Sequence, residues 1–236
     1  MKKRPGLSQP DPAKERERLL AIYDRLYAWL GPRHWWPAET PFEVIVGAIL
    51  TQSVAWRNVV RAIGNLKAAG LLDPWELYRA PVEEIERCIV PARFFKAKAK
   101  KLKAFMAHLC ERYGGSLDRM WERPLEELRR ELLGVYGLGP ETVDSILLYA
   151  GGYPVFVVDA YTRRIFSRLG IFPEKISYQA MQEHFRRHLP AEVPLFNEYH
   201  ALIDGLGHRL CRATDPRCGE CPLSGVCRTA KGGRTR

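Results

Sequence analysis

Four of the six cysteines lie close together near the end of the chain. Their spacing is C-x6-C-x2-C-x5-C, and the members are Cys211, Cys218, Cys221 and Cys227. Few apolar residues separate them, so packing alone does not explain the group. Four thiolates in one loop can hold a tetrahedral zinc ion or an iron–sulfur cluster. His208 could replace one ligand, whereas Cys88 and Cys110 fall in helical patterns and are expected to be inert.

A glycine-rich stretch, Gly137-Leu138-Gly139, is the second candidate for chemistry. Two glycines permit a tight turn with positive φ, and Pro140 suits the first turn of a following helix. The backbone N–H groups of such a turn can grip a phosphate without any side chain. The alternative is an ordinary packing corner between two helices.

A lone carboxylate, Asp159, follows the apolar residues Phe156-Val157-Val158 and precedes a predicted helix. An acid at this junction can simply cap the helix, which contributes about 1 kcal/mol. It can also be a catalytic group, because it combines a charge with an apolar setting. The residue alone does not decide between the two roles.

Taken together, the hairpin, the Gly152-Tyr153-Pro154 stretch, Asp159 and the cysteine spacing resemble the endonuclease III superfamily. These are the helix-hairpin-helix DNA glycosylases of base excision repair. The resemblance extends from about Leu19 to Cys227. It implies that the four cysteines hold a [4Fe–4S] cluster, with structural zinc as the alternative. It also implies that the hairpin binds the DNA backbone through Gly137, Leu138, Gly139, Glu141 and Thr142.

The resemblance implies that Asp159 is the catalytic residue, at the mouth of a pocket for a flipped base. A glycosidic bond is inaccessible inside a duplex, so the base must leave the stack. Cleavage builds positive charge on the sugar, and a carboxylate can stabilise that charge and orient or deprotonate water.

Glu141 occupies the hairpin position at which bifunctional members of the superfamily carry a lysine. That lysine forms a Schiff base with the sugar and allows strand cleavage. A glutamate cannot form an imine, so the resemblance implies a monofunctional enzyme without AP lyase activity. Lys96 or Lys98 could take over the lysine's role only if the fold brought one of them close.

The sequence Trp35-Trp36-Pro37, followed by the segment Gly47 to Gln52, is similar to the 3-methyladenine glycosylases of this superfamily. The similarity implies that Trp35, Trp36 and Pro37 line the base pocket, with Tyr161 contacting the substrate or DNA. Alkylated purines are cationic, and stacking on an aromatic ring contributes about 0.5–2 kcal/mol. The alternative for the tryptophans is a plain core role.

The expected activity is therefore release of 3-methyladenine or 7-methylguanine from duplex DNA. Four alternatives remain open: a glycosylase for uracil or thymine in mismatches or for adenine opposite oxidised guanine, a bifunctional glycosylase, a non-catalytic damage-binding protein, and a zinc-bearing DNA-binding module.

Double-stranded DNA containing a damaged base is the expected partner. The formal charge is +10 and the pI is about 9.4, which favours polyanions because lysine and arginine release counterions from phosphates. Gln52 resembles the residue that fills the gap left by a flipped base. Lys96 and Lys98 belong to a basic segment that, in this superfamily, lies along the DNA; a solvated helix face is the alternative.

The elements that must position these residues are predicted to be helices. Apolar spacing and Gly/Pro breaks predict a first helix that begins at Lys14 and is ended by Gly31-Pro32. A second helix is predicted at 41–53, and a third ends at about Ala69. Further helices are predicted at 74–79, 81–89, 96–113, 125–133, 140–150, 159–169, 177–189 and 194–208. The best strand-like stretch, 155–158, has only four residues. The fold expected is all-α, with two helical lobes and a cleft between them.

The expected organisation has four parts. Residues 1–13 form a flexible basic arm, 32–155 a six-helix barrel lobe with the hairpin, 14–31 and 156–227 a second lobe with the cysteine loop, and 228–236 a basic tail. No apolar signal segment or membrane span is recognisable in the sequence. We expect a cytoplasmic, nucleoid-associated monomer without membrane contact or disulfides.

Overall fold

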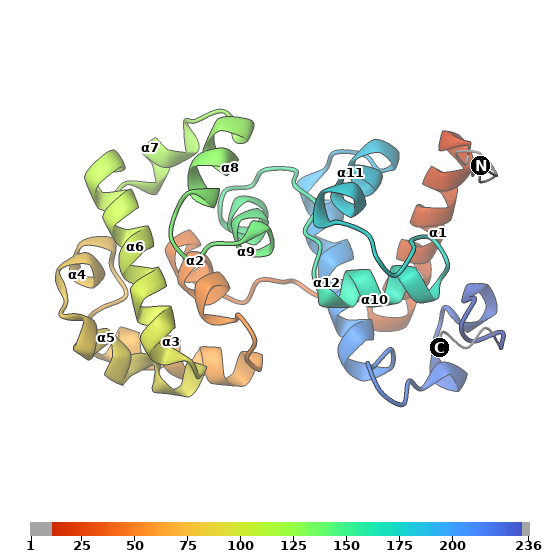
Figure 1. The fold of residues 1–236 in the computed structure, drawn as a ribbon, viewed down its shortest axis with the longest axis horizontal. Coiled ribbons are helices and arrows are strands. Elements are labelled where there is room, and N and C mark those ends of the chain that lie inside the picture. The colour runs from red at the N-terminus through yellow and green to blue at the C-terminus, as the bar shows by residue number, and fades with distance from the viewer. Residues whose placement is uncertain (1–10, 233–236) are drawn as a thin grey trace, which may run out of the picture. The chain divides into compact units, whose positions relative to one another are not determined.

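The computed structural model of the protein describes residues 11–232, and every regular element in that range is helical. This confirms the all-α prediction. The chain divides into two compact units, which we call the central unit (residues 36–157) and the terminal unit (described residues 11–35 and 158–232) (Figure 1). The terminal unit is therefore built from both ends of the chain. No helix within residues 11–232 is long and apolar enough to cross a membrane.

The central unit is organised around one buried helix, α2 (Pro41–Leu50). Thr40 caps it by accepting a hydrogen bond from the Glu43 backbone N–H at 3.1 Å, and Pro41 occupies its first turn. Every residue after Pro41 is buried. The other helices of the unit are α3 (Trp56–Ala68), α4 (Pro74–Arg79), α5 (Val82–Ile89), α6 (Phe95–Tyr113), α7 (Leu117–Trp121), α8 (Leu125–Leu133) and α9 (Pro140–Ser145).

Two predicted helices of the central unit differ in the structure, and one helix is additional. The helix predicted at 41–53 ends at Leu50, because the chain turns there and Ser53 adopts a positive φ of 56°. The helix predicted at 140–150 continues beyond α9 as a π-helical turn over Ile146–Ala150. The short helix α7 was not predicted, although Ser116 caps it by accepting from the Arg119 N–H.

The terminal unit consists of α1 (Pro12–Leu30), α10 (Ala160–Arg168), α11 (Tyr178–His188), α12 (Val193–Arg209) and the cysteine loop. α1 packs against α11 and α12, so the two ends of the sequence share one core (Figure 1). Phe166, Phe185 and Tyr199 are fully buried in that core. The Tyr199 hydroxyl donates to the Leu19 carbonyl at 2.8 Å, which joins α12 to α1.

The predicted flexible arm 1–13 needs correction at its end. Pro12 and Ala13 already belong to α1, because the Asp11 carboxylate accepts from the Ala13 N–H at 3.0 Å and caps the helix. The rest of the arm, and residues 233–236 of the predicted basic tail, lie outside the described residues. The stretch 155–158 is buried but is not a strand.

Candidate active site and metal centre

Asp159 lies at the N-cap of α10 in the terminal unit. Its Oδ1 accepts two hydrogen bonds from Thr162, one from the backbone N–H at 2.6 Å and one from the hydroxyl at 2.7 Å. The side chain is 11% exposed. The carboxylate does cap its helix, but only one of its oxygens does so. The geometry therefore fixes the orientation of the acid and leaves Oδ2 for other partners.

The partner of that second oxygen comes from α12. His200 Nε2 lies 3.7 Å from Asp159 Oδ2, and the imidazole is as shielded from solvent as the acid. One turn further, Asp204 has a carboxyl whose pKa is raised, chiefly by burial. Asp204 Oδ2 is 3.3 Å from His208 Nδ1. These three α12 residues follow one another at intervals of four, which places them on one face of the helix.

Tyr161, predicted to line the base pocket, packs against α12. Its hydroxyl lies 3.0 Å from His208 Nε2, and its ring occupies the space that a side chain at Gly207 would need. The Arg164 guanidinium covers the ring at 4.8 Å from its centroid. Tyr161 thus joins α10 to α12 beside the acid, and His208 is engaged with it rather than with the cysteines.

The hairpin is a well-held turn in the central unit. Gly137 has a φ of 81°, and the Lys101 side chain occupies the position where a Cβ at Gly137 would lie. Leu138 is buried, which anchors the turn to the core. Gly139 is the N-cap of α9, and a Cβ there would meet nothing within 4 Å. The open space at Gly139 leaves its backbone approachable from outside.

Gln52 binds the hairpin directly. Its Nε2 donates to Thr142 Oγ1 at 2.8 Å and more weakly to the Gly137 carbonyl at 3.4 Å. Lys101 Nζ donates to Gln52 Oε1. Gln52 and Thr142, both predicted to contact DNA, are therefore bonded to each other. Lys101, which the sequence did not indicate as a site residue, joins this hydrogen-bonded group.

The predicted basic segment separates into two environments. Lys96 is exposed, as expected. Lys98 is buried at 2% exposure, and its ammonium donates to the carbonyls of Leu50 and Ala92 at 2.7 Å each. Burial, and secondarily the nearby Lys101, lowers the pKa of Lys98 to about 8. Lys98 therefore holds the end of α2 from inside the unit, and the expectation that it faces DNA is corrected.

Glu141 occupies the hairpin position at which bifunctional members of the superfamily carry a lysine. Glu141 is exposed in the first turn of α9. Three residues further, Asp144 is fully buried and forms a two-point ion pair with Arg129 of α8, at 2.7 and 3.0 Å. This pair fixes α9 against α8, so the turn that precedes α9 is positioned from both sides.

Trp36 belongs to an aromatic group in the central unit. Its ring centroid lies 5.2 Å from that of Trp56 and 5.3 Å from that of Tyr149, both in edge contacts. Trp36 is half-buried, and Gly47 makes room for it, since a Cβ there would lie 3.2 Å from the indole. Sequence reasoning missed Trp56 and Tyr149, which lie far from Trp36 in the chain. Trp35 is half-buried and Pro37 is exposed.

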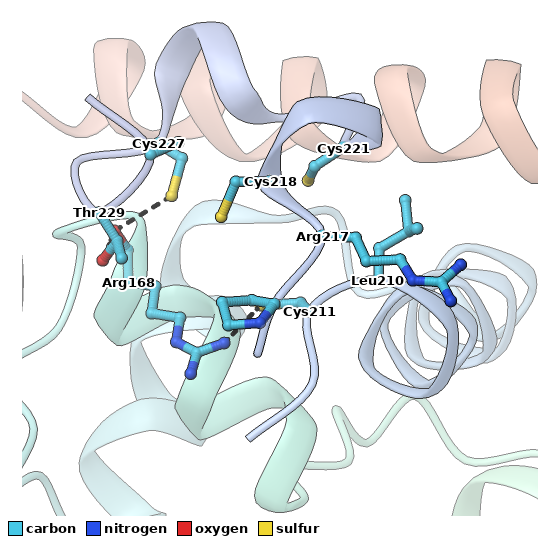
Figure 2. Close-up of a pocket in the computed structure, with 10 residues that line it drawn as sticks. Arg168, Leu210, Cys211, Arg217, Cys218, Cys221, Cys227 and Thr229 are labelled. Carbon is cyan, nitrogen blue, oxygen red and sulfur yellow. Dashed lines mark hydrogen bonds between the residues drawn. The ribbon is translucent and has the colours of Figure 1, made fainter. Parts of the chain in front are cut away.

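The four cysteines line one cavity in the terminal unit. Figure 2 shows them around a common space, with Arg168 beside Cys211. The Arg168 guanidinium donates to Cys211 Sγ at 3.3 Å and to the Arg212 carbonyl at 2.7 Å. The Arg168 carbonyl in turn accepts from Cys227 Sγ at 3.4 Å. The C-terminal turn of α10 is thus joined to both ends of the cysteine set.

The donor set of this cavity fits a sulfur-ligated metal group. The lining contains four sulfur atoms and the cations Arg168 and Arg217, with no carboxylate or imidazole. Thiolates are the ligands of iron–sulfur clusters and of many zinc sites. Within residues 11–232, no three histidine, cysteine or acidic side chains converge as closely as a single ion requires.

The chain matches a known family over most of its length. The family described as "HhH-GPD superfamily base excision DNA repair protein" matches residues 46–191. The "Putative DNA repair glycosylase MJ1434" of Methanocaldococcus jannaschii is 43% identical over 212 residues, which are 89% of this chain and 96% of that protein.

Solved structures share the fold. A structure of a non-covalent endonuclease III–DNA complex superposes with a TM-score of 0.79 at 22% identity, and covers 92% of this chain and 96% of the other. The Helicobacter pylori 3-methyladenine DNA glycosylase bound to 1,N6-ethenoadenine gives a TM-score of 0.69 at 25% identity, and covers 82% and 95%. With its helical fold and matching sequence, the chain belongs to the HhH-GPD superfamily of base excision DNA repair proteins.

Proposed function

We propose that this protein is a monofunctional DNA glycosylase that hydrolyses the N-glycosidic bond of alkylated purines in duplex DNA. Asp159 is the observation that carries the proposal. One of its oxygens is held by Thr162, so the other has a fixed direction. A carboxylate with a fixed position and little solvent stabilises a developing sugar cation better than a mobile one.

Cleavage of an alkylated purine makes modest demands on the enzyme. The base carries a positive charge, so it leaves with the bonding electron pair as a neutral molecule. The protein then needs an anion near the sugar and an acceptor for the proton of the attacking water. Asp159 supplies the anion, and no general acid is needed for the leaving base.

The aromatic group of Trp36, Trp56 and Tyr149 supports a cationic base as the substrate. Electron-rich rings attract cations by about 0.5–2 kcal/mol, more than they attract a neutral base of the same size. A neutral uracil or thymine would require hydrogen-bond partners along its edge instead. The likeness to the H. pylori 3-methyladenine glycosylase agrees with this choice.

The hairpin supports DNA backbone binding without lyase chemistry. Gly139 leaves its backbone open, and Glu141 is exposed where an imine-forming amine would be needed. The ammonium of Lys98 is enclosed by two carbonyls, so that residue does not replace the missing lysine. The expected product is an intact strand carrying an abasic site.

Cys211, Cys218, Cys221 and Cys227 would hold a [4Fe–4S] cluster in this proposal. Such a group, when bound, cross-links the loop. Its role is structural, because hydrolysis requires no electron transfer. The all-sulfur donor set fits such a cluster, and the likeness of the cysteine spacing to the endonuclease III superfamily supports it over zinc. Iron and sulfide analysis, with zinc measured in the same sample, distinguishes the two.

The test is a base-release assay on methylated duplex DNA, with each sample divided for alkali treatment. Release of methylated purines, with strand breaks only after alkali, is expected. Strand breaks without alkali would contradict the monofunctional part. Release from uracil, thymine-mismatch or adenine–oxidised guanine duplexes, and none from methylated DNA, would contradict the substrate.

A further inference from the structure

The catalytic acid has a neighbour that the mechanism above does not use. His200 projects from α12 toward Asp159, with 3.7 Å between Nε2 and Oδ2. Both residues belong to the terminal unit, and α10 packs directly against α12. Side-chain exposure is 11% for each, and His200 Nε2 itself is buried, so the pair is shielded from bulk solvent.

The two oxygens of Asp159 have different surroundings. Oδ1 receives two donors from Thr162, whereas Oδ2 faces the imidazole. At 3.7 Å the two side chains are too far apart for a direct hydrogen bond. A water molecule beside them could bond to both at once. An anionic oxygen and a ring nitrogen would then share one nucleophile.

We propose that His200 is the general base of the reaction and that Asp159 stays ionised throughout. The inference rests on the proposed glycosidic hydrolysis and deepens it. If Asp159 took the proton of the water, it would lose the charge that stabilises the sugar cation. A neutral imidazole next to it removes this conflict, because a second group accepts the proton.

The step balances without any co-reactant. The bond from C1′ to the base nitrogen breaks, and its electron pair leaves with the base. The water oxygen forms a bond to C1′, and the water proton passes to His200 Nε2. The imidazolium then lies within ion-pair distance of Asp159 Oδ2, which stabilises it. Loss of this proton to solvent restores the site.

Several other titratable groups lie around the imidazole. Asp204 of α12 interacts electrostatically with both His200 and Asp159, and it is paired with His208. From α10, Tyr161 approaches Asp204 and Asp159. From α1, Tyr23 and Asp24 approach the neighbouring Tyr199. These are the titratable groups around the pair on α1, α10 and α12.

The experiment measures single-turnover base release against pH for wild type, His200→Gln and His200→Gly. The rate of the wild type should fall toward acid pH, where the imidazole is protonated and cannot accept a proton. His200→Gln should be about 10²-fold slower and lack that limb of the profile. Added imidazole should restore part of the activity of His200→Gly. His188→Gln, on α11, is the matched histidine control and should respond to neither.

The outcomes separate this inference from the proposed function. Wild type that is active, with His200→Gln equally fast and an unchanged pH profile, would overturn the general base alone. A slow His200→Gln variant with the wild-type pH profile, together with no imidazole rescue, would overturn it in favour of a packing role. Wild type that releases no base from any lesion duplex would overturn both.

Discussion

The two units stabilise their functional loops in different ways. The hairpin of the central unit is held by buried Leu138, by the Arg129–Asp144 pair and by Gln52. The cysteine loop of the terminal unit has Leu210 and Leu223 as buried residues, and its four thiols are free of disulfides. The first loop is held by contacts within the chain, whereas the second is proposed to be held also by a metal group bound to its four cysteines.

This difference assigns separate tasks to the two units. The proposed recognition elements, the hairpin and the aromatic group, belong to the central unit. The proposed catalytic residue Asp159 and its neighbour His200 belong to the terminal unit, whose cysteine loop is proposed to hold a metal group. Changes at the hairpin or the aromatic group should therefore affect recognition first, and changes at Asp159 should affect the chemical step.

The largest effect is expected for Asp159→Asn. The amide still accepts from the Thr162 N–H and caps α10, but it carries no charge for the sugar cation. Base release should fall by about 10²–10⁴-fold, with DNA affinity and melting temperature close to wild type. Single-turnover kinetics and a binding titration check this. A large loss of affinity would show that chemistry and recognition are not divided between the units as described.

Cys218→Ser tests whether the cysteine loop depends on the proposed metal group. The loop should lose protection from hydrogen exchange over residues 210–230, and the last turn of α10 should follow because Arg168 contacts Cys211. Solubility and DNA affinity should fall before the chemistry of Asp159 changes. Hydrogen exchange followed by peptide mass spectrometry measures this, and the central unit is the internal reference. Equal loss of protection in both units would contradict the claim that only the terminal unit depends on the metal group.

Lys98→Met tests whether the central unit depends on its own contacts. Two buried carbonyls, those of Leu50 and Ala92, would lose their donor, so the free energy of unfolding should fall by about 1–3 kcal/mol at pH 7. Lys96→Met, at an exposed site, should change it by less than about 0.5 kcal/mol. Urea unfolding monitored by tryptophan fluorescence measures both.

The same variant has a predicted pH dependence. The pKa of Lys98 falls from 10.5 to about 8 on folding, so the unfolded state binds more protons between these values. The lysine's contribution to the free energy of unfolding therefore rises from pH 8 to 10.5. The difference between wild type and Lys98→Met should widen over that range. A constant difference would contradict the lowered pKa.

The smallest effect is expected for Trp36→Leu. Loss of the indole should slow release of a cationic alkylpurine by about 2–30-fold, the equivalent of 0.5–2 kcal/mol. A neutral base should be affected less. Trp75→Phe, in the same unit but in contact with Tyr78, is the matched control. Equal losses for charged and neutral bases would assign Trp36 to the core.

Local signals made much of the fold predictable. α4 and α8 have their predicted bounds because Asp73-Pro74 and Pro124 mark their starts. Asp11-Pro12 carries the same signal, and it was overlooked. The π-helical turn after Ser145 was not predictable in this way, because its residues have the spacing of an ordinary helix.

The candidate site was predictable only where one residue carries the signal. Asp159 and the cysteines have recognisable surroundings in the sequence, and the structure gives both sets a defined environment. His200 and Tyr149 were not predictable, because their contacts with Asp159 and Trp36 form only when separate segments meet in the fold. Lys98 was misjudged because a lysine-rich segment gives no indication of which side chain turns inward.

The construction of the terminal unit from both chain ends has a consequence for biosynthesis. α1 leaves the ribosome first, yet its partners α11 and α12 are translated about 150 residues later. The central unit can fold in the meantime, since domains generally fold as units. The apolar face of α1, with Leu19 and Leu26, therefore stays uncovered until α11 and α12 have been translated. The cysteines emerge later still, so loading of the proposed metal group would follow the synthesis of α11 and α12.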